Sequence, residues 1–200
     1  MSNEVDETAE LEAEEERFTL SPEDAERRRQ ALRLVRQFGD PVLKTRALEV
    51  ERFDDDLRRE IERMAGLMDD AFGVGLAATQ VGNLNRVFVY RVEPDSPTNV
   101  VINPVIEWSS KETETAEEGC LSLPAVHVDV ERPLHVRVRA KDAFGDDIEI
   151  EASGLEARVI QHETDHLDGV LILDRISRSA RKDAMRAMRE AMEDWDTPAE

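Results

Sequence analysis

The chain has 200 residues, of which 40% are hydrophobic and 36% are charged, and its formal net charge at pH 7 is −20. This length and composition suit one globular domain, and the excess of acids argues against direct binding of DNA or RNA, whose phosphates would be repelled. No apolar run is long enough to span a membrane, and the N-terminus resembles neither a secretory signal nor a transit peptide, so we expect a cytoplasmic protein with no membrane contact.

The two ends of the chain differ from its middle in composition. Residues 4–16 hold many acids and no base, and such a segment has too little apolar surface to offset the entropy lost on ordering. We therefore predict a disordered acidic arm over residues 1–20. Residues 21–196 are predicted to form a single domain, followed by a tail of residues 197–200.

The first strong periodic pattern predicts a helix that begins after Asp54. Apolar residues recur there every three to four positions, behind a run of aspartates that can cap the first turn, and Gly73 is placed to end the helix. The apolar face consists of Leu57, Ile61, Met64, Leu67 and Met68. Short strands with alternating or β-branched residues are predicted next, at 86–92, 99–106, 134–140 and 146–154.

Two further helices are predicted towards the C-terminus. Ser153 and Glu156 have the spacing of a capping box, so a helix should begin there, with a core-facing stripe made of Leu155, Val159, His162 and His166. A last helix, 177–195, carries on one side Ala184, Met188, Ala191 and Trp195. This order indicates an α+β fold: antiparallel sheets packed around a central helix, with an N-terminal helix and a C-terminal helix.

The stretch "QHETDHLDG", residues 161–169, gives the central helix a candidate metal site. His162 and His166 are four positions apart, so both imidazoles lie on one side of a helix and can reach the same cation. Glu163 supplies a base beside them. The alternative is a pair of core histidines satisfied by hydrogen bonds, but this would bury two polar groups for no gain. We therefore favour a metal-binding helix.

A third metal ligand has to come from elsewhere in the chain. Glu190 and Glu193 lie downstream, on the predicted solvent face of the last helix. Cys120, the single cysteine, stands upstream in "EEGCLSLP" and has no partner for an internal disulfide. Alone it would most often be an inert buried residue. Beside a metal that lacks one ligand, its thiolate completes a set that suits Zn(II) or Fe(II) and leaves one position open.

A third stretch, "GVGLAATQ" at residues 73–80, offers contacts from the backbone as well as a side chain. Gly73 and Gly75 let the backbone pass close to a ligand, and the amide of Gln80 can donate to a carbonyl oxygen. The same letters also fit a helix end followed by a turn. Both interpretations stay open on this stretch alone.

Together the three stretches resemble peptide deformylase, a family with the signatures G-x-G-L-A-A-x-Q, E-G-C-L-S and Q-H-E-x-D-H-L-x-G in this order. Every fixed position is filled here, and the resemblance extends from residue 36 to residue 177. It implies a cytoplasmic hydrolase that removes the formyl group from the N-terminal formyl-methionine of nascent polypeptides and releases formate.

The resemblance also implies roles for individual residues. One divalent metal ion, Fe(II) in the cell and Zn(II), Ni(II) or Co(II) in purified protein, would be held by Cys120, His162 and His166. Glu163 would be the general base and acid. The oxyanion would be stabilised by the side chain of Gln80 and the backbone N–H of Leu121.

The residues implied to bind the peptide include one departure from the family. The extended peptide would lie along the backbone of Val74, Gly75 and Gly119, and its methionine side chain would contact Leu155 and Val159. Many relatives have an arginine three residues after the proline of E-G-C-L-S-x-P, where it meets the peptide. Here this residue is His127, and Ala125 replaces a common glycine. His127 is thus a candidate for peptide binding, with a solvent-facing strand residue as the open alternative.

Two other functions compete with deformylation. A silent member of the fold would bind formylated or other peptides without cleaving them, although the intact Glu163 and Gln80 argue against it. A general metallopeptidase with the H-E-x-x-H motif would need a ligand downstream, where the chain has no further histidine. Among partners, we expect nascent formyl-methionyl chains and, because a terminal helix contacts the ribosome in some relatives, a transient ribosome contact.

Overall fold

The computed structural model describes residues 20–195, with side chains described as far as residue 190. The predicted acidic arm, apart from its last residue, and the predicted tail therefore lie outside the described residues. In chain order the elements are α2 (Pro22–Leu32), η2 (Pro41–Lys44), α3 (Asp55–Asp70), β1 (Gly75–Ala77), η3 (Ala78–Val81), β2 (Val87–Tyr90), β3 (Asn99–Ser109), β4 (Thr113–Cys120), β5 (Leu123–Pro133), β6 (His135–Lys141), β7 (Asp147–Ser153), α4 (Gly154–Leu167), η4 (Ile172–Asp174) and α5 (Arg178–Trp195).

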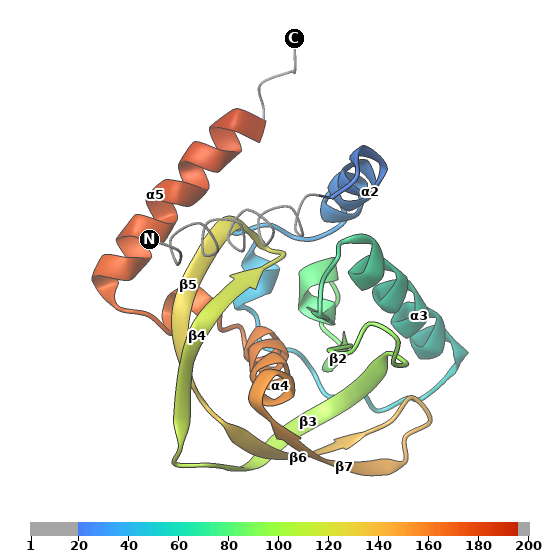
Figure 1. Cartoon of the computed structure of the whole chain (residues 1–200). Coiled ribbons are helices and arrows are strands. Elements are labelled where there is room, and N and C mark those ends of the chain that lie inside the picture. Colours follow the sequence, from blue (N-terminus) through green and yellow to red (C-terminus); the bar gives the residue numbers. More distant parts are fainter. Residues whose placement is uncertain (1–19, 196–200) are drawn as a thin grey trace, which may run out of the picture.

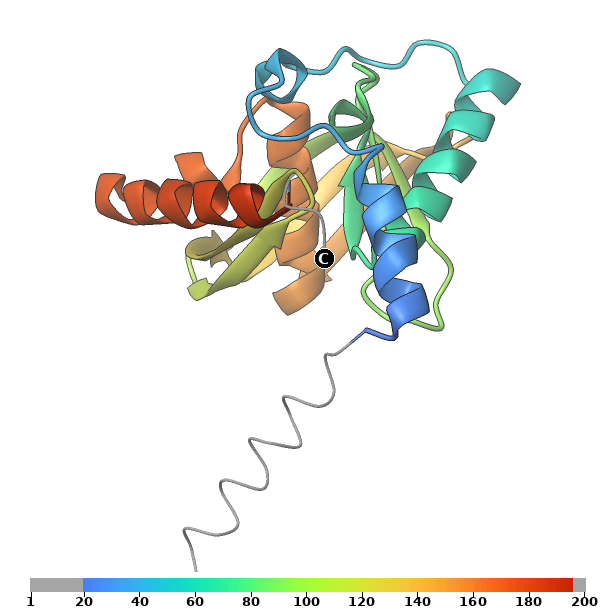
Figure 2. The ribbon, with the colours of Figure 1, turned by 90° about the horizontal axis from the view of Figure 1, so that it is seen from above.

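The strands form two antiparallel sheets on either side of helix α4. One sheet has five strands in the order β1-β2-β3-β6-β7, and the other is the hairpin of β4 and β5. Figure 1 shows α4 between the hairpin and the larger sheet, with α3 on the far side of β2. The view from above in Figure 2 shows the same central position of α4. The predicted α+β fold around a central helix is confirmed.

The larger sheet buries one face because its strands alternate. In β6, Val136 and Val138 are buried, whereas Arg137 and Arg139 between and beyond them point to solvent. The two arginines pair with acids of neighbouring strands, Arg139 with Glu107 at 2.7 Å. Burying each valine contributes about 1.5–3 kcal/mol, so the apolar face of the sheet holds α4 in place.

Helix α3 begins as predicted and ends differently. The Asp54 side chain accepts a hydrogen bond from the Leu57 N–H at 3.2 Å, the N-cap bond expected of this residue. At the other end the left-handed residue is Phe72, with φ +55°, and not Gly73. The Gly73 N–H then bonds to the carbonyl of Met68 at 2.9 Å. This is the usual helix-ending pattern with a phenylalanine at the position that favours glycine.

Helix α4 begins at the predicted residue without the predicted capping box. The Ser153 side chain lies 2.8 Å from Nδ1 of His135 and makes no cap bond, while Glu156 accepts a hydrogen bond from the Tyr90 hydroxyl. Leu155 is 58% exposed and so is not part of the core-facing stripe, where the sequence pattern placed it.

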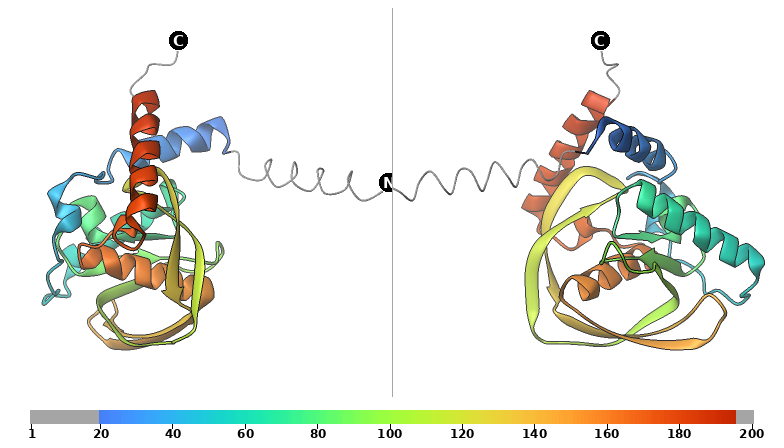
Figure 3. Two further views of the ribbon diagram at one scale, coloured as in Figure 1. Left: turned by 90° about the vertical axis from the view of Figure 1, so that its left-hand side faces the viewer. Right: turned by 45° about the vertical axis from the view of Figure 1, so that its right-hand side comes forward.

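The helices at the two ends of the described chain cover different parts of the body. Helix α2 was not singled out by the sequence pattern; Ser21 caps it by accepting a hydrogen bond from the Asp24 N–H at 3.1 Å. Helix α5 packs along β5 through the buried Ala184 and Met188 and then extends away from the body (Figure 3). The side chains of Ala191 and Trp195, predicted on the same face, lie outside the described residues. No described helix has the length and apolar character to cross a membrane.

Candidate metal centre

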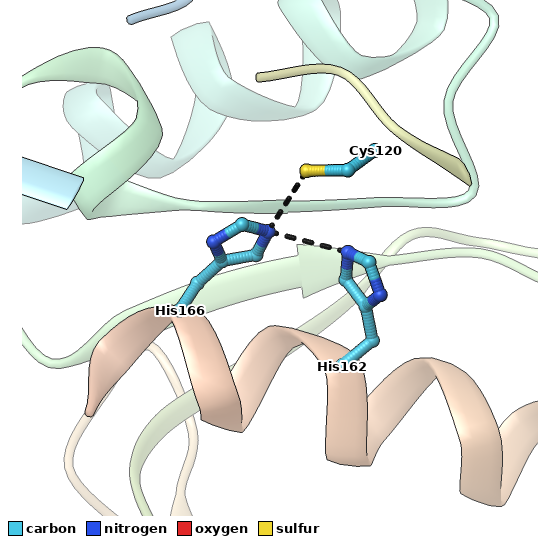
Figure 4. A group of neighbouring side chains, drawn as sticks. All are labelled: Cys120, His162 and His166. Carbon is cyan, nitrogen blue, oxygen red and sulfur yellow. Dashed lines mark hydrogen bonds between the residues drawn. The ribbon is translucent and has the colours of Figure 1, made fainter. Parts of the chain in front are cut away.

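Three possible metal ligands from two distant segments meet beside helix α4. His162 and His166 lie one turn apart on the helix, and Cys120 approaches them from the end of β4 (Figure 4). The Nε2 atoms of the two histidines are 3.2 Å apart, and Sγ of Cys120 is 3.3 Å from Nε2 of His166. The ligand atoms all lie within 4.8 Å of one another. The structure thus brings together the three residues that the sequence singled out.

These separations fit one tetrahedral cation. With metal–nitrogen and metal–sulfur distances of roughly 2.0 and 2.3 Å, tetrahedral geometry puts two ligand atoms about 3.3–3.6 Å apart. The two distances in the structure are close to these values. Three protein ligands leave the fourth position of a tetrahedron for water or substrate, as in catalytic sites. The donor set therefore fits a catalytic divalent metal.

The orientation of His162 is fixed by a buried carboxylate. Nδ1 of His162 lies 3.0 Å from Oε2 of Glu118, which directs Nε2 towards the other ligands. Glu118 is itself held by Arg132, with two hydrogen bonds of 2.6 and 2.9 Å. A carboxylate behind a ligating histidine selects the ring's tautomer and raises its basicity. Burial alone would raise the pKa of Glu118, but hydrogen bonds from Arg132 and His162 outweigh it and lower this pKa to about 2.

Two further charged residues extend this network along α4. Arg158 donates to Oε1 of Glu118 at 2.8 Å and to the Val130 carbonyl at 2.8 Å, so it joins α4 to the hairpin. Arg132 also donates to Asp165 at 2.9 Å. Each of these charges has a partner of opposite sign. The pairing matters because a buried charge that loses its partner is left uncompensated.

Sequence reasoning did not assign functions to Glu118, Arg132 and Arg158. Glu118 could have been predicted, because it precedes Cys120 by two residues and alternate residues of a strand point to the same side. Arg132 and Arg158 carry no such local signal, because their partners are far away in the chain.

Glu163 is buried beside the metal ligands. Its side chain is almost inaccessible, and its Oε2 atom has no hydrogen-bond partner in the part of the chain that the structure describes. Burial raises the pKa of Glu163 to about 7, against the lowering charges of His162 and Arg132. Burial is the main cause of a lowered pKa of His166, which favours the neutral form of this imidazole.

The glycine stretch approaches Glu163 through its backbone. A Cβ atom on Gly75 would lie 2.3 Å from Oε1 of Glu163, so only glycine fits here without displacing the carboxylate. Gln80 follows one turn later and is buried: its Oε1 accepts from the Ala77 N–H at 2.9 Å, and its Nε2 lies 3.7 Å from Sγ of Cys120. The close-approach interpretation of this stretch is thus supported by the geometry.

The residues expected to contact a peptide differ in their exposure. Val74 is 50% exposed and Leu155 is 58% exposed, while Val159 is 5% exposed and belongs to the core under the sheet. His127 is exposed on β5 opposite Gly119, and its Nδ1 lies 3.5 Å from a carboxylate oxygen of Glu117. His127 is therefore exposed beside the strand residue that directly precedes Cys120.

Ala125 adopts the left-handed conformation that explains why glycine is common there. Its φ is +56°, a conformation that a residue with a Cβ adopts at a cost. The residue belongs to the start of β5, directly after the turn that follows Cys120.

Comparison with known proteins gives one consistent family. Residues 32–182 match the family model of polypeptide deformylase. A peptide deformylase of Thermotoga neapolitana is 53% identical over 147 residues, covering 74% of this chain and 88% of the relative. A crystal structure of a peptide deformylase from Legionella pneumophila superposes with a TM-score of 0.78 at 37% identity, covering 82% of this chain and 98% of that one. A crystal structure of a peptide deformylase from Synechococcus elongatus in complex with actinonin superposes with a TM-score of 0.74 at 44% identity, covering 78% of this chain and 85% of that one.

Proposed function

The chain belongs to the peptide deformylase family, and from this membership we propose the residues that carry out its reaction. It is a metal-dependent hydrolase that removes the formyl group from the N-terminal formyl-methionine of nascent polypeptides and releases formate. The meeting of Cys120, His162 and His166 around one point is the observation that supports the assignment of the centre. We assign these three residues as the metal ligands.

The family implies a divalent metal ion, and the donor set fits one. When bound, such an ion supplies Lewis-acid chemistry and lowers the pKa of a coordinated water towards neutrality. We propose Fe(II) as the ion in the cell, with Zn(II), Ni(II) or Co(II) in purified protein, because one thiolate and two imidazoles accept all four. Glu118 and Arg132 hold His162 in the orientation that this binding requires.

Glu163 is proposed as the general base and then the general acid. It takes a proton from the attacking water as the new bond to the formyl carbon forms, and it returns this proton to the amine nitrogen as the carbon–nitrogen bond breaks. Its buried carboxylate beside the ligands supports this assignment. The second proton of the water also passes to the amine as formic acid ionises, so the products are formate and the protonated amine and the proton count balances.

Two donors are proposed for the negative charge that develops on the formyl oxygen. The side-chain amide of Gln80 lies next to Cys120 and is fixed by its bond to the Ala77 N–H. The backbone N–H of Leu121 directly follows the same cysteine in the chain. Fixed donors of this kind stabilise an oxyanion without reorganisation.

The substrate is proposed to lie between two backbone edges. The backbone of Val74, Gly75 and Gly119 would pair with the extended peptide, while Leu155 and Val159 would contact the methionine side chain. The exposure of Val74 and Leu155 supports this placement. His127, opposite Gly119 at the outer face of the hairpin, would contact a later residue of the peptide.

We also propose cytoplasmic action on chains as they leave the ribosome, with a transient contact through α5. This helix exposes Arg178, Lys182 and Arg189 in an otherwise acidic protein. Co-sedimentation with ribosomes at low salt, lost when the three residues are changed to Glu, tests the contact.

The deformylation assignment is tested by two peptides that differ only in the formyl group. Metal-loaded protein should release a free amine from formyl-Met-Ala, and it should leave unformylated Met-Ala uncut. Actinonin, which is bound in the Synechococcus elongatus structure, should inhibit the first reaction. Binding of formyl-Met-Ala without amine release would instead favour the silent peptide-binding protein, and cleavage of Met-Ala would favour a general metallopeptidase.

A further inference from the structure

Helix α2 lies outside residues 32–182, the part of the chain that the family model matches, except for its last residue. It nevertheless packs against two segments of the candidate active site. Ala31, Leu32 and Val35 form a buried cluster with Ala71, at the end of α3, and Leu121 packs against this cluster. The helix thus contacts both the loop before Gly75 and the turn after Cys120.

The first contact fixes the strained residue that leads into the glycine stretch. The guanidinium carbon of Arg27 lies 4.7 Å from the centre of the Phe72 ring, a cation–π distance. Arg28 donates from Nε to the Ala71 carbonyl at 3.3 Å. Because Phe72 holds a left-handed conformation that a side chain disfavours, these two arginines stabilise the turn from which the Val74–Gly75 backbone starts.

The second contact fixes the carbonyl groups around both proposed oxyanion donors. In the turn after α2, the Arg36 N–H donates to the Gln80 carbonyl at 2.7 Å, and the Phe38 N–H donates to the Ser122 carbonyl at 2.9 Å. Between them, the Gln37 side chain donates from Nε2 to the Leu121 carbonyl at 3.3 Å. Three consecutive residues therefore connect the Gln80 turn to the Leu121 turn.

We propose that Arg27, Arg28 and Gln37, within residues 22–38, position the deformylase active site, with separate effects on substrate binding and on turnover. Arg27 and Arg28 set the loop that pairs with the peptide, and Gln37 sets the turn that carries the Leu121 N–H. The inference rests on the proposed function. Small displacements of positioned groups lower rates strongly, so each contact acts on the reaction without touching substrate.

The split between KM and kcat distinguishes this role from a merely structural one. Metal-loaded, full-length protein is assayed with formyl-Met-Ala, with metal content and thermal midpoint measured on each variant. The double change Arg27→Ala and Arg28→Ala should raise KM by roughly three- to tenfold with kcat nearly unchanged. Gln37→Leu should lower kcat by roughly three- to tenfold with KM nearly unchanged.

Arg29→Ala is the matched control, because Arg29 lies on the same helix and pairs only with the exposed Glu26 among its described neighbours. It should change neither constant. Gln37→Glu keeps the size of the side chain and removes the donor, so it should repeat the loss of kcat even if Gln37→Leu folds poorly. The double change Arg27→Lys and Arg28→Lys keeps both charges, so it should recover most of the substrate affinity that is lost with alanine.

The inference is overturned if both constants stay at wild-type values in folded variants. It is also overturned if every variant loses kcat in proportion to unfolded protein, as a purely structural helix would require. A wild-type protein that releases no amine from formyl-Met-Ala would refute the proposed function instead, and the two failures are therefore distinguishable.

Discussion

Helix α4 is buried on two sides that differ in chemistry. Its sheet side, Ala157, Ile160 and Leu167, packs against an apolar face of the larger sheet. Its hairpin side, Arg158, His162 and Asp165, meets β4 and β5 through ion pairs and hydrogen bonds. Apolar burial stabilises without direction, whereas buried ion pairs fix orientation and cost several kcal/mol of stability when one partner loses its charge. We therefore expect the sheet side to contribute to stability alone, and the hairpin side to determine metal binding and to make stability depend on the charges of its carboxylates.

The largest effect should come from Glu163, which lies next to Gly75 of β1, beside the metal ligands, and does not belong to the ion-pair network. Glu163→Gln keeps the shape of the side chain but removes the proton acceptor, so turnover should fall by roughly 10²–10⁴ or more while the metal stays bound. Single-turnover rates and metal analysis on the same sample measure both. Unchanged activity with full metal content would refute the role of Glu163.

The second-largest effect should come from the ion-pair network around Glu118. Glu118→Gln removes the charge that orients His162 and leaves Arg132 without its bidentate partner. Metal affinity should fall by about 10–100-fold, the usual cost of losing such a support. Competition with a chelating dye gives the affinity. A metal affinity equal to that of the wild-type protein would show that the hairpin side does not position the ligand.

Low pH should weaken the contacts on the hairpin side of α4 and so lower the free energy of unfolding. The folded-state pKa of Glu118 is lowered to about 2, from an ordinary value of 4.5. Its contribution to stability, on the order of 3 kcal/mol, is therefore present above pH 4.5 and is lost as the pH falls towards 2. Urea unfolding between pH 6 and pH 2, with chelator present throughout, should show this loss. The Glu118→Gln variant should show a flatter dependence, and a parallel curve would contradict this attribution.

The smallest effect should come from the sheet side. Ile160 is fully buried, and Ile160→Val removes one methylene, which should lower the free energy of unfolding by about 0.5–1.5 kcal/mol. Neither kcat nor metal affinity should change. A change in metal affinity as large as that of Glu118→Gln would mean that the two sides of α4 do not have separate roles.

The same contrast explains what could be predicted from the sequence. Periodicity identified α3, α4 and the alternating strands, because a buried apolar face repeats locally. The spacing of His162 and His166 identified the metal-binding face, and Cys120 was found because the two histidines lacked a third ligand. The partners of Glu118 could not be predicted, since Arg132 and Arg158 come from a strand and a helix with no shared pattern.

Two other differences have local physical causes. Helix α2 was overlooked because its apolar face is short, although "SPED" at residues 21–24 has the cap, proline and acids of a helix start. The end of α3 was misplaced by one residue because Phe72 takes the conformation expected of glycine. Its ring is held by Arg27, a contact between separate helices that no local rule describes.

The central claim is that one sulfur and two imidazoles bind the same divalent ion, and Co(II) substitution tests it most directly. Because Cys120 is the single cysteine in the chain, any thiolate-to-cobalt charge-transfer absorption must come from it. We predict one Co(II) per chain, a charge-transfer band in the wild-type protein, and loss of this band in Cys120→Ser. A wild-type protein that binds Co(II) without the band would contradict the proposed centre.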